Sequence, residues 1–207
     1  MNIVVITNDD LRQELPEIQP TDITVQYTTE LSAVPGTDCY IDLLFQPTAA
    51  RINELKQLQP SLIIINSVIT TLKETDPGFV RINGWAGFLK RTITEASGCN
   101  DEAKNKAAHI LSYFGKKIEW VPDIPGFITA RVVSMIINEA YFALDEKVSS
   151  KEEIDTAMKL GTNYPYGPFE WGEKIGLKNI YDLLQDLSFT DKRYEPSSLL
   201  KSEATRS

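Results

Sequence analysis

The sequence predicts an α/β domain with a parallel sheet, followed by an all-α helical domain. Up to residue 123, short continuously apolar runs alternate with helical patterns, which is typical of buried parallel strands joined by crossover helices. From residue 125 onward, apolar residues recur mainly every three or four positions, the period of a helix. We therefore predict two domains, residues 1–123 and residues 124–207.

Composition excludes several classes of partner. The 207 residues are 42% hydrophobic, enough to fill a core. A formal net charge of −8 argues against nucleic acid or an anionic membrane as a partner, because both repel an acidic protein. No apolar run reaches the roughly 18 residues of a membrane span, and the N-terminus has no basic segment followed by an apolar one. We expect no membrane association and a cytoplasmic protein.

Metal binding is not expected. Cys39 and Cys99 stand alone without CxxC spacing, and His109 is the single histidine. Zinc sites need three or four such ligands, so we expect no metal and two free thiols. His109 lies beside Ile110 on a helix predicted over residues 101–114, and we expect a packing or solvated role for it rather than a catalytic one.

The predicted first domain contains seven strands, the last of them at the edge of the sheet. They cover residues 2–7, 22–28, 39–45, 61–66, 79–82, 92–95 and 117–121. A helix is predicted over residues 48–58, and Asn100 and Gly115 delimit the helix that carries His109.

The turn after the first strand lacks the glycine fingerprint of a dinucleotide-binding unit. Where GxGxxG would let the backbone approach a pyrophosphate, the chain has Asn8, Asp9 and Asp10. These residues could cap a short helix starting near Leu11, but two carboxylates repel a pyrophosphate. Glu30 is the acidic residue nearest the end of the second strand, and it comes late for holding an adenosine ribose. No cofactor-binding residues can be assigned.

The segment that opens the second domain predicts one long helix, apolar around most of its girth. Pro125 suits the first helical position, where its missing N–H costs nothing. A narrow polar stripe remains for water or polar partners, formed by Arg131, Ser134, Asn138 and Asp145. Such a helix must be covered on more than one side, and a second subunit would cover it.

Shorter helices are predicted after it. Ser150 and Glu153 form a capping box that starts one helix, and Gly161 is expected to end it. Pro168 begins the next helix and Gly176 ends it. A further amphipathic helix and a polar tail complete the chain.

The second domain contains four motifs in this order along the chain: PGFITAR, NEA, EEIDTAMKLG and YPYGPFE. They resemble the C-terminal helical domain of 3-hydroxyacyl-CoA dehydrogenases. TDCYIDLLF and LIIINS upstream, and YEPSSLL near the end, also resemble that family. Covering residues 20–200, the resemblance implies a shortened Rossmann-like domain, a helical domain that forms a homodimer, NAD as cofactor and an acyl-CoA as ligand.

The family's catalytic positions can be placed on this chain. In the family, a histidine takes the hydroxyl proton of a 3-hydroxyacyl-CoA during hydride transfer to NAD, and a glutamate orients that histidine. The glutamate position falls on Glu95 and the histidine position on Asn83, which cannot accept a proton. The family's asparagine position falls on Ala130, and its serine position on Val68, with Ser67 adjacent.

Candidate substrate-binding residues lie between Asn83 and Glu95. Trp85 could line an acyl pocket, together with Phe88 and Tyr164, or belong to the core. Lys90 and Arg91 could meet the phosphates of CoA, or be ordinary surface residues. Glu95 itself could be a former active-site carboxylate or a solvated strand end.

The sequence thus predicts a 3-hydroxyacyl-CoA dehydrogenase-like protein of the fatty-acid oxidoreductases that keeps the fold and the dimer but has lost ordinary NAD-dependent catalysis, a pseudoenzyme. Two alternatives stay open. One is a non-catalytic protein that uses the old interdomain cleft for an acyl-CoA, or its helical domain as an interaction platform. The other is an enzyme of altered chemistry with Glu95 as the base.

Overall fold

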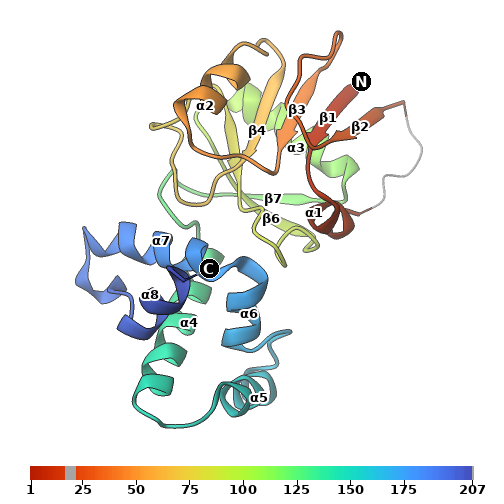
Figure 1. The fold of residues 1–207 in the computed structure, drawn as a ribbon. Helices are drawn as coiled ribbons and strands as arrows, with labels where there is room; N and C mark the ends of the chain where they lie inside the picture. The colour runs from red at the N-terminus through yellow and green to blue at the C-terminus, as the bar shows by residue number, and fades with distance from the viewer. Residues whose placement is uncertain (17–21, 207) are drawn as a thin grey trace. The chain divides into compact units, whose positions relative to one another are not determined.

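The computed structural model describes residues 1–16 and 22–206. The chain forms two compact units, Met1–Phe127 and Ile128–Ser207. The first is an α/β unit and the second is helical (Figure 1). Asp123, where the sequence places the domain boundary, lies in the segment between the last strand and the first helix of the second unit.

The α/β unit is built on one seven-stranded sheet. Its strands are β1 (Asn2–Ile6), β2 (Thr24–Thr28), β3 (Cys39–Asp42), β4 (Leu62–Asn66), β5 (Val80–Ile82), β6 (Ile93–Gly98) and β7 (Lys117–Trp120). Their order is β2-β1-β3-β4-β5-β6-β7, with β7 at an edge as predicted. The first five run parallel, whereas β6 pairs antiparallel with β5, and β7 is parallel to β6. The sheet is thus mostly parallel and Rossmann-like, as expected.

Helices cover both faces of this sheet. Alternate strand residues point to opposite faces, so Val4 and Ile63 join a core with α2 (Ala49–Lys56), while Val5 and Ile64 join a core with α3 (Asp101–Tyr113). Helix α1 (Asp9–Glu14) has only six residues. The side chains of Asn8, Thr48 and Asn100 cap the three helices by accepting backbone N–H groups.

The long helix of the second unit starts later than predicted. Helix α4 spans Thr129–Asp145, and Pro125 is not at its first position. Gly126 and Phe127 have φ values of 86° and 49°, in the left-handed region, so the chain turns sharply here instead of continuing as a helix. The amide of Gly126 donates to the carbonyl of Val68 at 2.7 Å, which fixes this turn.

The buried face of α4 also differs from the prediction. Ser134 and Asn138, expected in a stripe left for water or polar partners, are 0% and 2% exposed, whereas Ile128 and Val132 of the predicted apolar stripe are 55% and 51% exposed. The reason is a hydrogen-bonded contact that periodicity does not reveal. Asn138 donates to the carbonyl of Glu195 and accepts the amide of Ser197, and so holds the C-terminal segment.

Shorter helices complete the helical unit. They are α5 (Lys151–Thr162), α6 (Pro168–Ile175), α7 (Leu177–Ser188) and α8 (Ser198–Ala204), with a 3-10 turn at Lys192–Tyr194. The capping box of Ser150 and Glu153 is confirmed. Gly161 does not end α5, which continues to a left-handed residue at Asn163. The predicted polar tail is also wrong, because α8 buries Leu200 in the unit's core.

Candidate functional site

Asn83 and Glu95 lie side by side in the α/β unit. Asn83 directly follows β5, and β6 pairs antiparallel with β5. This pairing brings Asn83 next to Glu95, twelve residues later in the chain. The backbone amide of Asn83 donates to the carbonyl of Glu95, and its side-chain amide donates to Glu95 Oε2, each at 3.0 Å. The residues are 3% and 7% exposed. The two positions singled out from the sequence therefore form one hydrogen-bonded pair.

The chemistry open to this pair is limited. The amide nitrogen of Asn83 is a donor without a basic lone pair, so of the two side chains only the carboxylate of Glu95 can accept a proton. Asn83 can orient that carboxylate or hold a carbonyl group. It cannot act as the general base that a hydroxyl oxidation requires.

Asn66, the last residue of β4, holds the turn after Asn83 by hydrogen bonds. Asn66 accepts the amide of Gly84 at 2.9 Å and donates to the carbonyls of Gly84 and Leu43. A Cβ atom at Gly84 would lie 2.8 Å from the side chain of Asn66, so glycine is required at this close approach. Asn66 thus ties the ends of β3, β4 and β5 together.

The candidate substrate-binding residues differ in accessibility. Trp85 and Phe88 are 8% and 3% exposed, whereas Lys90 is exposed. The guanidinium of Arg91 stacks 4.4 Å from the ring centre of Phe88. Burial lowers the pKa of Arg91, and the nearby charge of Glu95 acts in the opposite direction. Tyr164 is 42% exposed in the helical unit.

Val68, Ser67 and Ala130, singled out through the resemblance, are all buried. Val68 is buried after β4, and its carbonyl receives the amide of Gly126. The hydroxyl of Ser67 donates to the carbonyl of Thr70 at 2.7 Å, a local turn contact. Ala130 is fully buried in α4.

A buried arginine beside these residues was missed by sequence reasoning. Arg81, at the centre of β5, has no exposed surface, and its Nε lies 2.5 Å from Oδ1 of Asp123. The guanidinium also donates to the carbonyls of Ser67 and Ile124. Burial lowers the pKa of Arg81, while Asp123 acts to raise it. This network anchors the segment after β7, and the lone charge in the apolar run FVRI was the available signal.

The start of α1 does not fit the pyrophosphate of NAD, the cofactor that the family implies. A dinucleotide site leaves the first amides of this helix open toward the phosphates. Here the side chain of Asn8 accepts the amide of Leu11 at 2.9 Å, and Asp9 and Asp10 occupy the first turn. The carboxylates would repel an anion, and no glycine allows a close approach.

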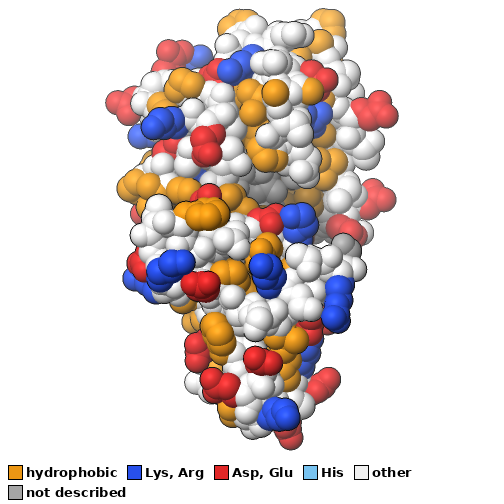
Figure 2. Space-filling view, turned by 60° about the vertical axis from the view of Figure 1, so that its left-hand side comes forward, with side chains coloured by type: hydrophobic (Ala, Val, Ile, Leu, Met, Phe, Trp, Pro, Cys, Tyr) orange, Lys and Arg blue, Asp and Glu red, His pale blue; other side chains and the backbone are white. Residues whose placement is uncertain are grey.

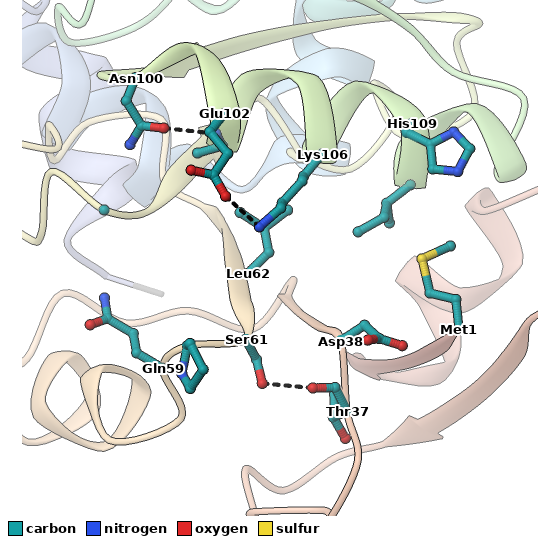
Figure 3. Close-up of a pocket in the computed structure, with 14 residues that line it drawn as sticks. Met1, Thr37, Asp38, Gln59, Ser61, Leu62, Asn100, Glu102, Lys106 and His109 are labelled. Atoms are coloured by element: carbon teal, nitrogen blue, oxygen red, sulfur yellow. Dashed lines mark hydrogen bonds and ion pairs between the residues drawn. The ribbon is translucent and has the colours of Figure 1, made fainter.

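The histidine lies near the amino ends of the parallel strands, opposite the ends that carry Asn66 and Asn83. His109 lines a hollow of about 1110 Å³ between α3 and the amino ends of β1, β3 and β4 (Figure 3). Its Nε2 atom lies 3.1 Å from the hydroxyl of Tyr113. Asn83 follows the carboxyl end of β5, so His109 does not reach the Asn83–Glu95 pair. The hollow mixes charged and apolar side chains, among them Asp38, Glu102, Lys106, Leu62 and Ile110.

Within residues 1–16 and 22–206, no three His, Cys, Asp or Glu side chains group as a metal site would require. Over the same residues, no helix has the length and apolar character needed to cross a membrane.

Comparison with known proteins gives a consistent result. Residues 126–205 match the family described as 3-hydroxyacyl-CoA dehydrogenase, C-terminal domain. A 3-hydroxyadipyl-CoA dehydrogenase of Escherichia coli is 45% identical over 115 residues, which are 55% of this chain but 24% of that protein. A 3-hydroxybutyryl-CoA dehydrogenase of Bradyrhizobium diazoefficiens is 38% identical over 48% of this chain and 35% of that protein. The chain thus spans about a quarter to a third of these relatives.

Longer matches extend over both units. A probable 3-hydroxybutyryl-CoA dehydrogenase of Bacillus subtilis is 39% identical over 201 residues, which are 95% of this chain and 69% of that protein. The solved (S)-3-hydroxybutyryl-CoA dehydrogenase of Ralstonia eutropha superposes with a TM-score of 0.72 at 25% identity, covering 88% of this chain and 70% of that one. Sequence and fold agree: the chain belongs to the 3-hydroxyacyl-CoA dehydrogenase family.

Proposed function

We propose that this chain is a 3-hydroxyacyl-CoA dehydrogenase homologue that has lost ordinary NAD-dependent catalysis. The observation that carries the proposal is the Asn83–Glu95 pair, because Asn83, at the position that the resemblance assigns to the family's base, is an amide bonded to the carboxylate. Loss of a general base costs about 100-fold to 10,000-fold in rate. The closed start of α1, with its two aspartates, adds a second obstacle because it disfavours the cofactor.

An acyl-CoA is the ligand class we propose for the retained site. Relatives named 3-hydroxybutyryl-CoA and 3-hydroxyadipyl-CoA dehydrogenase act on substrates of this class. Lys90 and Arg91 carry the positive charge that the phosphates of CoA require. A non-catalytic acyl-CoA-binding protein is the alternative that fits the same residues, and a cytoplasmic location stays a prediction.

The test measures NADH oxidation by the purified chain with acetoacetyl-CoA, with the Bacillus subtilis relative as positive control. We expect no turnover. We also expect none from Asn83→His, because restoring the base leaves the start of α1 unchanged. Turnover by the wild-type chain would overturn the proposal. A rate that depends on Glu95, lost in Glu95→Gln, would identify the enzyme of altered chemistry with Glu95 as base.

Binding of acetoacetyl-CoA in the same preparation separates the two non-catalytic forms. Saturable binding that weakens with rising salt and in Lys90→Met supports the acyl-CoA module, since a phosphate contact is screened by salt. No binding favours an interaction protein that uses only the helical unit.

A homodimer through α4 is the second proposal. Ile128, Val132 and Phe142 lie along α4 at helical spacing and are 55%, 51% and 38% exposed. Figure 2 shows hydrophobic side chains reaching the surface among acidic and basic ones on one face of the molecule. Exposed apolar residues in a row are typical of a protein interface. We expect twice the chain mass by light scattering and a shift toward monomer in Val132→Glu; a monomeric wild-type chain would contradict the dimer.

A further inference from the structure

The loop that connects Asn83 with β6, residues 84–92, is held from two sides. Both carboxylate oxygens of Glu14, the last residue of α1, lie 2.7 Å from the amide nitrogen of Gly87. Lys116, between α3 and β7, donates from Nζ to the carbonyl of Leu89 and, at 2.8 Å, to that of Arg91. The three anchoring points span the middle and the end of the loop.

The amine of Lys116 lies in an apolar environment. The residue is 5% exposed. It shares a small cavity with Thr94 and with apolar side chains from several elements, among them Val5 of β1, Leu89 of the loop and Phe114 beside α3. Among the described residues, the charge that acts on the amine is that of Glu14 from α1; Arg91 meets the amine only through its backbone carbonyl.

The number of acceptors matches a neutral amine. A neutral Nζ has two N–H groups, and two carbonyls accept from it. A charged Nζ has three N–H groups and loses its hydration when it is enclosed by apolar side chains. The site therefore satisfies the neutral form better than the charged form.

We infer that Lys116 is a positioning residue for the Asn83–Glu95 pair: as a neutral amine it holds the connecting loop closed, and its protonation favours opening of the loop. The inference rests on the proposed function only in taking that pair as the site. Asn83 and β6 are the two ends of the loop, so its closure sets their surroundings.

The sign of the pH effect follows from proton linkage. Burial lowers the pKa of Lys116 from 10.5 to about 8, and the charge of Glu14 acts in the opposite direction. An open loop exposes the amine to water and returns its pKa toward the ordinary value. At a pH between these two pKa values, the open loop binds more protons than the closed loop. The equilibrium constant for closing the loop therefore rises with pH between about 8 and 10.5 and is constant below about 8. Over the whole range, the equilibrium constant for closing the loop can change by roughly 300-fold at most.

Hydrogen exchange of the whole chain, read by mass spectrometry on peptides from residues 84–92, tests the inference. Protection factors corrected for intrinsic exchange are compared from about pH 7 to about pH 10, the window set by linkage. We expect wild-type protection to rise about tenfold to 100-fold across it. Peptides from α2, which makes no contact with Lys116, serve as the internal reference and should show no such rise.

Two variants assign the effect to Lys116. Lys116→Met cannot titrate, so its loop protection should be independent of pH and about tenfold lower than wild type at high pH, because two carbonyls lose their donors. Glu14→Gln keeps an acceptor for Gly87 but removes the negative charge, which should move the rise to lower pH.

Flat wild-type protection would overturn the inference, as would a rise that persists in Lys116→Met. If that variant does not fold, an unshifted rise in Glu14→Gln overturns it instead. Turnover of acetoacetyl-CoA with NADH would refute the proposed function and leave the exchange result standing, so the two failures are distinguishable.

Discussion

Replacing Arg81 by methionine is expected to destabilise the α/β unit strongly. Methionine keeps most of the volume but removes every donor of a guanidinium that has no exposed surface. Asp123, with a side chain 24% exposed, loses its ion-pair partner, and the carbonyls of Ser67 and Ile124 lose theirs. Breaking a buried pair costs about 3–5 kcal/mol. Because Asp123 reaches water and still accepts the amide of Leu72, we expect the low end, about 3 kcal/mol.

Urea unfolding followed by tryptophan fluorescence measures this loss. At a slope of about 2 kcal/mol/M, the midpoint of Arg81→Met should fall by roughly 1.5 M. Lys178→Met, which removes an exposed pair with Asp182 in α7, is the matched control and should change stability by at most about 0.5 kcal/mol. Equal midpoints for Arg81→Met and wild type would refute the view that this network anchors the segment after β7.

Further substitutions test individual contacts. Ser134→Ala should be neutral or stabilise by up to about 1 kcal/mol in thermal unfolding, because the described residues give its buried hydroxyl no partner; a loss would reveal one. Gly167→Ala should cost about 2 kcal/mol, since a Cβ would collide with the side chain of Asp155. By contrast, Gly161→Ala, with open space around it, should stabilise α5 by about 0.5–1 kcal/mol. Burial raises the pKa of Asp42 above its ordinary value of 3.8 in the folded protein. The unfolded chain therefore loses this proton first, and the contribution of Asp42 to stability falls as the pH rises from 3.8 to the raised pKa. Asp42→Asn should flatten this part of the stability–pH curve in urea titrations, and an unchanged curve would contradict the assignment.

The architecture of both units could be predicted from local patterns. All seven predicted strands occur, and the apolar runs of β1 and β4 were the clearest signals because a strand buried on both faces is apolar throughout. The capping residues Asn100 and Ser150 were predictable because a cap depends on neighbours within one turn. The reversal of β6 was not, since a strand's apolar pattern is the same in either direction.

The errors share a physical cause. Asn138 was assigned to a stripe for water or polar partners, but its partners Glu195 and Ser197 could not be named because they are distant in the chain. Gly161 was taken as a helix end, although Asn163 provides the left-handed residue. In each case a tertiary contact or a backbone conformation overrode the local preference of the residue.

The candidate site was partly predictable. Its two members were found because the resemblance supplied a spacing, and the antiparallel pairing of β5 and β6 then brings them together. Arg81 and Lys116 were not found. A lone cation inside or beside an apolar run shows that something must neutralise or solvate it, but the identity of the partner depends on the fold.

Equilibrium titration of the wild-type chain with NADH, followed by the fluorescence of the cofactor, tests the central claim most directly. The carboxylates of Asp9 and Asp10 and the capped amide of Leu11 predict no saturable binding at micromolar concentrations, at low or high salt. Saturable micromolar binding, with turnover once acetoacetyl-CoA is added, would contradict it.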